Sequence, residues 1–200
     1  MANKIFLDVG THSGQSIDTF RNYFPNSEEY KIYCWEPDTV FEKSIKSRDV
    51  EKNGGEVFMK AAWSDDEGRK LYIDQGSTGH GNSMYHEKIS GGIREEISID
   101  VECMNFSQFI LDNFSKDDYI IMKFNTEGAE FEVFPHMIST GAMEYIDVLF
   151  GEWHDDKVPI MSTQDSEKLL SDTEKIVGRF RRWYNDGEIL IKNGDLEDSK

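Results

Sequence analysis

A glycine loop between an apolar run and a helical pattern is the feature that most constrains this chain. Residues 5–9 are apolar apart from Asp8, the loop that follows holds Gly10 and Gly14, and apolar side chains at helical spacing resume at Ile17. A second strand-like run ends in Glu36. This order is the layout of a nucleotide-type pocket in an open α/β sheet, where backbone N–H groups at a helix start face the ligand and the acid binds ribose hydroxyls.

The spacing of the glycines narrows the choice of ligand. A dinucleotide fingerprint needs glycines at 10, 12 and 15, but His12 and Gln15 stand there, and no lysine follows the loop as a phosphate-binding P-loop requires. An acid at the strand end suits a ligand that carries an ammonium group. S-adenosylmethionine fits, with its ammonium and carboxylate near the loop and its ribose on Glu36. The missing glycines count against a nicotinamide oxidoreductase, which stays as an alternative.

Five segments resemble the motifs of the FkbM-type methyltransferase family, and they follow one another in the family's order. They are residues 7–14, 35–38, 61–65 with Gly68, 121–130, and 151–154. The fourth segment is similar to the family signature Lys-Ile-Asp-x-Glu-Gly-x-Glu, except that Asn125 replaces the usual Asp. A metal-binding or basic role at that position is therefore in doubt. A cofactor-binding module without catalysis remains a further alternative.

The resemblance implies an S-adenosylmethionine-dependent O-methyltransferase that acts on a hydroxyl of a sugar, a glycan or a similar metabolite. The strand and helix patterns independently predict a doubly wound, Rossmann-like α/β sheet with helices on both faces, in one domain over residues 1–200. Strands are predicted at 4–9, 31–36, 56–62, 69–73, 97–103, 118–124, 146–150 and 188–192. Helices are predicted at 14–24, 39–47, 106–113, 129–139 (broken at Pro135 or running from just before it) and 163–184.

The first core strand starts within four residues of Met1, whereas methyltransferase folds generally have a helix before it. We therefore expect either that the chain is a piece of a larger multidomain protein or that a neighbouring domain or partner covers this face.

Ligands in such sheets lie beyond the strand ends at the switch point, here between the first and fourth core strands. The residues predicted to bind the cofactor are Asp8, Gly10, Thr11, His12, Gly14, Ser16, Glu36, Pro37, Ala62, Trp63 and Asn125. The flexible stretch 76–83 is predicted to close over the bound cofactor, or to be a plain surface loop.

Three residues on the same edge are predicted to be catalytic. His154 is the predicted general base, while Lys123 and Glu127 place the acceptor. Each also has a structural explanation. Lys123 could form a buried ion pair with Glu127, Glu130 or Glu152. Glu127 could have the purely structural role of a helix cap, and His154 could be a hydrogen-bonded core residue.

A divalent metal site is a rival use of the acidic residues. Mg²⁺ or Mn²⁺ would suit oxygen ligands together with a histidine. The candidates are Glu127, Glu130, Glu152, His154, Asp155 and Asp156. Because no ligand spacing among them is diagnostic, we expect transfer without a metal.

Charge and cysteine content bound the remaining possibilities. The net charge of −17 opposes binding to nucleic acids and anionic membranes. Cys34 and Cys103 have no metal-binding spacing, so we expect buried, reduced thiols. No apolar run approaches the ~20 residues of a membrane span, and no signal sequence opens the chain. These features predict a soluble, cytoplasmic protein.

Overall fold

A computed structural model describes residues 2–76 and 81–192. Within these ranges the strands are β1 Lys4–Val9, β2 Tyr30–Trp35, β3 Glu56–Phe58, β4 Ala61–Trp63, β5 Arg69–Tyr72, β6 Ser98–Val101, β7 Cys103–Asn105, β8 Tyr119–Phe124, β9 Val148–Gly151 and β10 Phe180–Arg182. The α-helices are α1 Gln15–Tyr23, α2 Glu42–Lys46, α3 Phe106–Asn113, α4 Glu130–Thr140, α5 Thr163–Val177 and α6 Gly187–Lys192.

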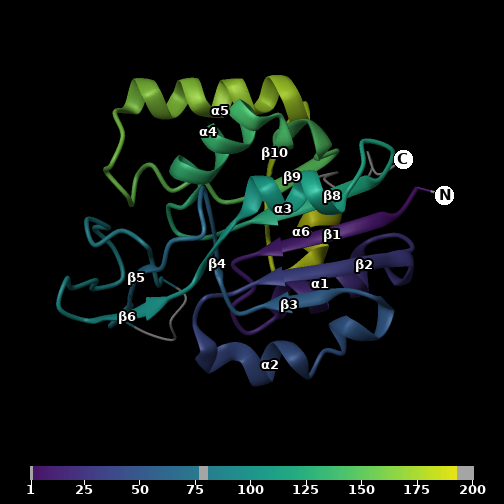
Figure 1. The fold of residues 1–200 in the computed structure, drawn as a ribbon, viewed down its shortest axis with the longest axis horizontal. Coiled ribbons are helices and arrows are strands. Elements are labelled where there is room, and N and C mark those ends of the chain that lie inside the picture. The colour runs from purple at the N-terminus through teal and green to yellow at the C-terminus, as the bar shows by residue number, and fades with distance from the viewer. Residues whose placement is uncertain (1, 77–80, 193–200) are drawn as a thin grey trace.

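The centre of the molecule is a six-stranded parallel sheet in the order β10-β9-β8-β1-β2-β3. The strand order reverses between β1 and β8, so the switch point lies where it was predicted. Two small sheets, β4-β7 and β5-β6, complete the fold. Figure 1 shows β5 and β6 beyond the carboxyl ends of β1 and β2.

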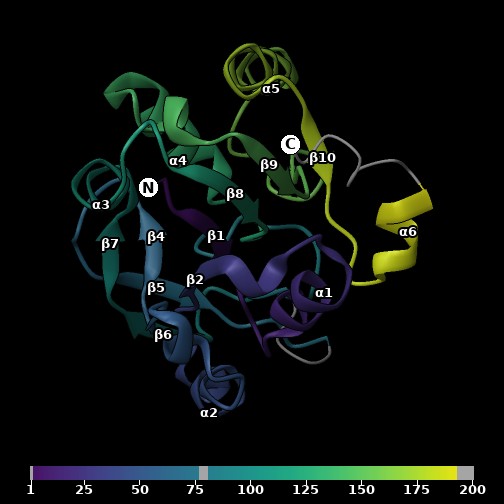
Figure 2. The ribbon, with the colours of Figure 1, turned by 90° about the vertical axis from the view of Figure 1, so that its right-hand side faces the viewer.

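Helices cover both faces of the central sheet, which confirms the predicted fold class. Side chains of a strand alternate between faces, and accordingly Ile5 and Leu7 of β1 pack in one apolar cluster while Phe6 packs in the other. The first cluster includes buried residues of α3, α4 and α5, and the second includes those of α1, α2 and α6. Figure 2 shows α3 and α4 on one side of the strands and α1 and α6 on the other.

Four predicted elements were wrong. The run 97–103 is divided, because β6 pairs with β5 whereas β7 pairs with β4. The run 56–62 is divided, because β3 pairs with β2 whereas β4 leaves the sheet and pairs with β7. The helix predicted over 163–184 ends at Val177, since Gly178 takes a positive φ of 80°, and the chain then re-enters the sheet as β10. Residues 188–192 belong to α6, in which Leu190 is buried while its neighbours Ile189 and Ile191 are exposed.

The remaining expectations have mixed outcomes. The break or start predicted at Pro135 was wrong, because α4 runs through this residue without interruption. Both cysteines are free and buried. Part of the predicted closing segment, residues 77–80, lies outside the described residues. No helix within the described part of the chain has the length and apolar character needed to cross a membrane.

Candidate active site

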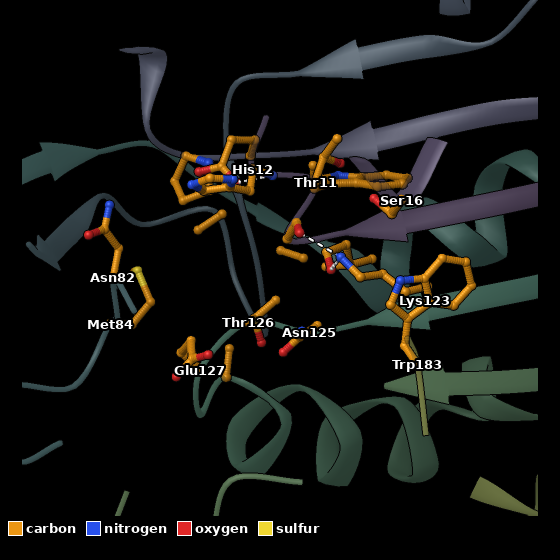
Figure 3. Close-up of a pocket in the computed structure, with 18 of the residues that line it drawn as sticks. Thr11, His12, Ser16, Asn82, Met84, Lys123, Asn125, Thr126, Glu127 and Trp183 are labelled. Carbon is orange, nitrogen blue, oxygen red and sulfur yellow. Dashed lines mark hydrogen bonds between the residues drawn. The ribbon is translucent and has the colours of Figure 1, made fainter. Parts of the chain in front are cut away.

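A cleft opens at the carboxyl ends of β1 and β8, with an empty volume of about 860 Å³ including its mouth. The described residues that line it are Val9, Gly10, Thr11, His12, Gln15, Ser16, Trp35, Glu36, Pro37, Ala61, Ala62, Leu71, Asn82, Met84, Lys123, Asn125, Thr126, Glu127, Ala129, Trp183 and Asn185. In Figure 3, Thr11 and His12 lie across from Asn125, Thr126 and Glu127, so the two predicted loops do face each other.

Gly10 allows these loops to approach closely. It has a φ of +76°, and a Cβ on it would lie 1.9 Å from the carbonyl oxygen of Asn125. Its N–H donates to the carbonyl oxygen of Trp35, and the N–H of Asn125 donates to that of Val9. The glycine therefore fixes the floor of the cleft, where β1, β2 and β8 meet.

Asp8 lies beneath the cleft and does not line it. Its side chain is fully buried, and it accepts a 2.5 Å hydrogen bond from the hydroxyl of Ser16 at the start of α1. Lys123 is opposite Asp8 in the β1–β8 register, and its Nζ lies 3.1 Å from Asp8 Oδ1 and donates to the Gly10 carbonyl at 2.6 Å. The partner of Lys123 is thus Asp8, not one of the predicted glutamates. This buried pair ties the glycine loop to the sheet.

Glu36 occupies the end of β2 and holds the loop in place from the other side. Its two carboxylate oxygens accept hydrogen bonds from the N–H groups of His12 and Asp38, at 2.8 and 2.9 Å. Burial raises the pKa of Glu36 to about 7, even though these two donors act in the opposite direction. Its carboxylate faces the cleft, as binding of ribose hydroxyls would require.

Two polar atoms of the β8 loop are available to a ligand. Asn125 Oδ1 and Thr126 Oγ1 are buried and have no hydrogen-bond partner among the described residues, and both residues line the cleft. Because unpaired buried polar atoms are costly, this pair fits a ligand that brings donors. The site thus suits a cofactor with an ammonium group and hydroxyls.

One far wall of the cleft includes Asn82, from the stretch 76–83 that was predicted to close over the cofactor, and the other wall comes from a segment that the sequence did not assign to the site. Leu71, Asn82 and Met84 close one end, where the amide of Asn82 donates to Asp38 Oδ2 at 3.1 Å. Trp183 and Asn185 close the other, and the indole N–H of Trp183 donates to Asn185 Oδ1. Figure 3 shows Trp183 beside Lys123. Because Trp183 was predicted to lie within a helix over 163–184, its position in the cleft wall was not foreseen.

A histidine and three glutamates form a cluster next to the cleft, in which His154 and Glu130 are buried and Glu127 and Glu152 are partly exposed. His154 has no exposed surface, and its Nδ1 lies 2.7 Å from Glu130 Oε1. Its Nε2 faces Glu127 Oε1 at 3.5 Å and Glu152 Oε2 at 3.7 Å. Burial alone would lower the pKa of His154, but Glu127 and Glu130 raise it to about 9. Burial would raise the pKa of Glu127, but His154 and Lys88 lower it to about 2.

The predicted site residues thus fall into two groups. Those that line the cleft are Gly10, Thr11, His12, Ser16, Glu36, Pro37, Ala62, Asn125, Lys123 and Glu127. Those that do not are Asp8, Gly14, Trp63 and His154. Gly14 lies against the Arg48 side chain, and Trp63 packs near Tyr85 and Arg69.

Comparison with known proteins identifies the family. Residues 8–176 match the family described as the methyltransferase FkbM domain. No curated protein and no solved structure gives a match. The matched region contains both cleft loops and the buried histidine cluster, and methyltransferases of this kind generally use S-adenosylmethionine. The chain therefore belongs to the FkbM-type methyltransferase family.

Proposed function

We propose that this methyltransferase transfers the methyl group of S-adenosylmethionine to a hydroxyl oxygen of a sugar, a glycan or a similar metabolite. The observation that carries the proposal is the cleft at the β1–β8 switch point, which has the Glu36 carboxylate on one wall and the unpaired Asn125 and Thr126 oxygens on another. The bound cofactor supplies an electrophilic methyl group. The chain's own part is to align the acceptor with it and to assist removal of the hydroxyl proton.

The cofactor residues are proposed to act in three parts of the cleft. Glu36 accepts hydrogen bonds from the ribose hydroxyls, beside His12 and Pro37. Ala62 borders the adenine, where a small side chain leaves room for the base. The loop from Gly10 to Ser16 and Asn125 hold the methionine part. Asp8 supports this loop from below through Ser16 and Lys123, in place of the direct contact that the sequence predicted.

The catalytic roles rest on position. Glu127 lines the cleft and is the proposed contact with the acceptor. Lys123 donates a hydrogen bond to the Gly10 carbonyl and also lines the cleft that the acceptor is proposed to enter. The base role of His154 stays a prediction. Because its pKa is raised to about 9, the imidazole must first lose a proton at neutral pH, and it reaches the cleft only through Glu127. If it is the base, His154→Ala should lower kcat by ~10²–10⁴ while cofactor affinity stays unchanged.

Incubation with methyl-labelled S-adenosylmethionine and a panel of sugars and glycans tests the proposed reaction. We expect label in a hydroxyl-bearing acceptor, in an alkali-stable ether that mass spectrometry can place. Binding of S-adenosylhomocysteine without transfer to any acceptor would instead favour the cofactor-binding module. The predicted cytoplasmic location and a neighbouring domain beside the N-terminal face remain predictions.

A further inference from the structure

The histidine and glutamate cluster beside the cleft brings one buried nitrogen and two partly exposed carboxylate oxygens toward a common point. His154 Nε2, an oxygen of Glu127 and an oxygen of Glu152 all lie within 4.8 Å of one another. Among the described residues, Nε2 has no hydrogen-bond partner, although His154 has no exposed surface. A buried imidazole nitrogen thus lies at ion-pair distance from two carboxylates without a hydrogen bond to either.

In each of the three side chains, the second polar atom already has a partner on the side away from this common point. Glu130 can only accept, so Nδ1 of His154 carries the hydrogen between them, and a cation that displaces the proton from Nε2 is bound by the lone pair of that nitrogen. Lys88 Nζ lies 2.8 Å from Glu127 Oε2, which leaves Oε1 directed at the ring. Lys157 Nζ lies 3.0 Å from Glu152 Oε1, which leaves Oε2 in the same direction.

Such outer contacts are what orient ligands around a protein-bound metal. A carboxylate on the far nitrogen of a ligating histidine fixes its tautomer and its ring orientation. Glu130 is further fixed because its other oxygen accepts from the N–H of Gly128. The four residues come from the loop after β8, the start of α4 and the segment after β9, so the fold itself assembles them.

We propose that Glu127, Glu152 and His154 bind one divalent transition-metal cation at the edge of the cleft. In a site with metal–ligand bonds of about 2.1 Å, ligand atoms lie roughly 3–4 Å apart. The separations of 3.5 and 3.7 Å from His154 Nε2 agree with this spacing. One imidazole and two carboxylates suit Mn²⁺, Fe²⁺ or Zn²⁺ better than Ca²⁺, which takes oxygen ligands alone.

The three protein ligands leave coordination positions free, and Glu127 places the ion next to the cleft. Resting on the proposed methyl transfer, the cation's role is to bind the acceptor hydroxyl and lower its pKa, so that its proton passes to water as the methyl group moves from the sulfonium sulfur to the oxygen. In this arrangement His154 is a ligand and not the general base. Asp155 and Asp156, which the sequence also offered as ligands, are exposed and outside this group of three.

Mn²⁺ titration of the chelator-treated full chain, followed by electron paramagnetic resonance, tests the site. We expect one bound Mn²⁺ per chain with a nitrogen coupling from the imidazole. Glu152→Gln, at a half-buried position, should weaken binding at least tenfold, whereas the matched Asp156→Asn should bind as the wild type does. Binding of S-adenosylhomocysteine in chelator serves as the folding check, because neither substitution touches the cleft lining.

Each outcome decides the proposal. Equal Mn²⁺ affinity in Glu152→Gln and Asp156→Asn, binding without nitrogen coupling, or no stoichiometric binding would overturn the site. Methyl transfer that is undiminished in chelator would overturn the catalytic role. A wild-type chain that binds Mn²⁺ but not S-adenosylhomocysteine would retain the metal site and refute the proposed function, so the two failures are distinguishable.

Discussion

Gly10 is a position where a single methyl group decides whether the site can form. A Cβ there would lie 1.9 Å from a backbone oxygen of Asn125, which cannot move without distorting β8. Gly10→Ala should therefore cost much more than the ~1–2 kcal/mol of the left-handed conformation alone. Gly141→Ala is the matched control, because Gly141 has a φ of +81° with no atom within 4 Å of the added Cβ. Urea unfolding of both variants measures the difference, and equal losses would contradict the close approach.

Glu36 should make cofactor affinity depend on pH. Burial raises its pKa to about 7 in the free protein. Hydroxyls that donate to the carboxylate favour its ionised form, so the bound state holds fewer protons and affinity rises as the pH rises through about 7. Calorimetry with S-adenosylhomocysteine should show up to about tenfold tighter binding at pH 8 than at pH 6. Glu36→Gln controls for titrating groups on the ligand, and an unchanged pH dependence in that variant would exclude Glu36 as the cause.

The sequence predicted residues of the cleft well where chemistry and chain position coincide. Gly10, Glu36 and Asn125 directly follow strands whose carboxyl ends meet, so the sequence indicated both their chemistry and their position at the cleft. The predicted cofactor contact of Asp8 was wrong, because a single sequence does not distinguish an acid that binds a ligand from an acid that pairs with a buried lysine. The pairing depends on the β1–β8 register, which places Lys123 opposite Asp8 and is a tertiary property.

At the scale of elements, a proline inside helix α4 destabilises it, and substitution of this residue should stabilise the protein. Pro135 lies inside the helix and is exposed, so the Phe131 carbonyl has no N–H from position 135 to accept. Pro135→Ala should raise the free energy of unfolding by about 2–3 kcal/mol, which is the gain of ~3 kcal/mol in the helix less the ~0.4–1 kcal/mol from added entropy of the unfolded chain. Pro159→Ala, in an exposed loop, should instead lower it by ~0.4–1 kcal/mol. Denaturant unfolding compares the two, and the same sign in both would refute this account of α4.

Element errors arose where local signals competed. The pattern of polar and apolar residues over 163–184 predicted one long helix, although Gly178 within it is a typical helix-end residue. The helix does end there, and the chain then turns into β10 and brings Trp183 to the wall of the cleft. Residues 188–192 hold a short apolar run between two charged residues, as a short strand can, yet they belong to a helix in which only Gly187 and Leu190 are buried. In short segments a period of 2 and a period of 3.6 cannot be separated, so packing decides.

At the scale of the whole molecule, alternation of strands and helices was enough to predict the parallel sheet and its switch point. Crossover connections are right-handed and short, which leaves few ways to wind such a chain. The two small sheets could not be predicted, because β4 pairs with β7 and β5 with β6 although the partners lie far apart in the sequence. They matter for function, since β4 and β5 contribute Ala61, Ala62 and Leu71 to the cleft.

Calorimetric binding of S-adenosylhomocysteine tests most directly the central claim, that the cofactor occupies the β1–β8 cleft. We predict binding by the wild type and a loss of at least ~1.4 kcal/mol, about tenfold, in Glu36→Ala. Glu42→Ala is the control, because Glu42 lies on α2 and pairs with Lys46 outside the cleft. Equal affinity of Glu36→Ala and the wild type, or a preference of the wild type for NAD, would contradict the account.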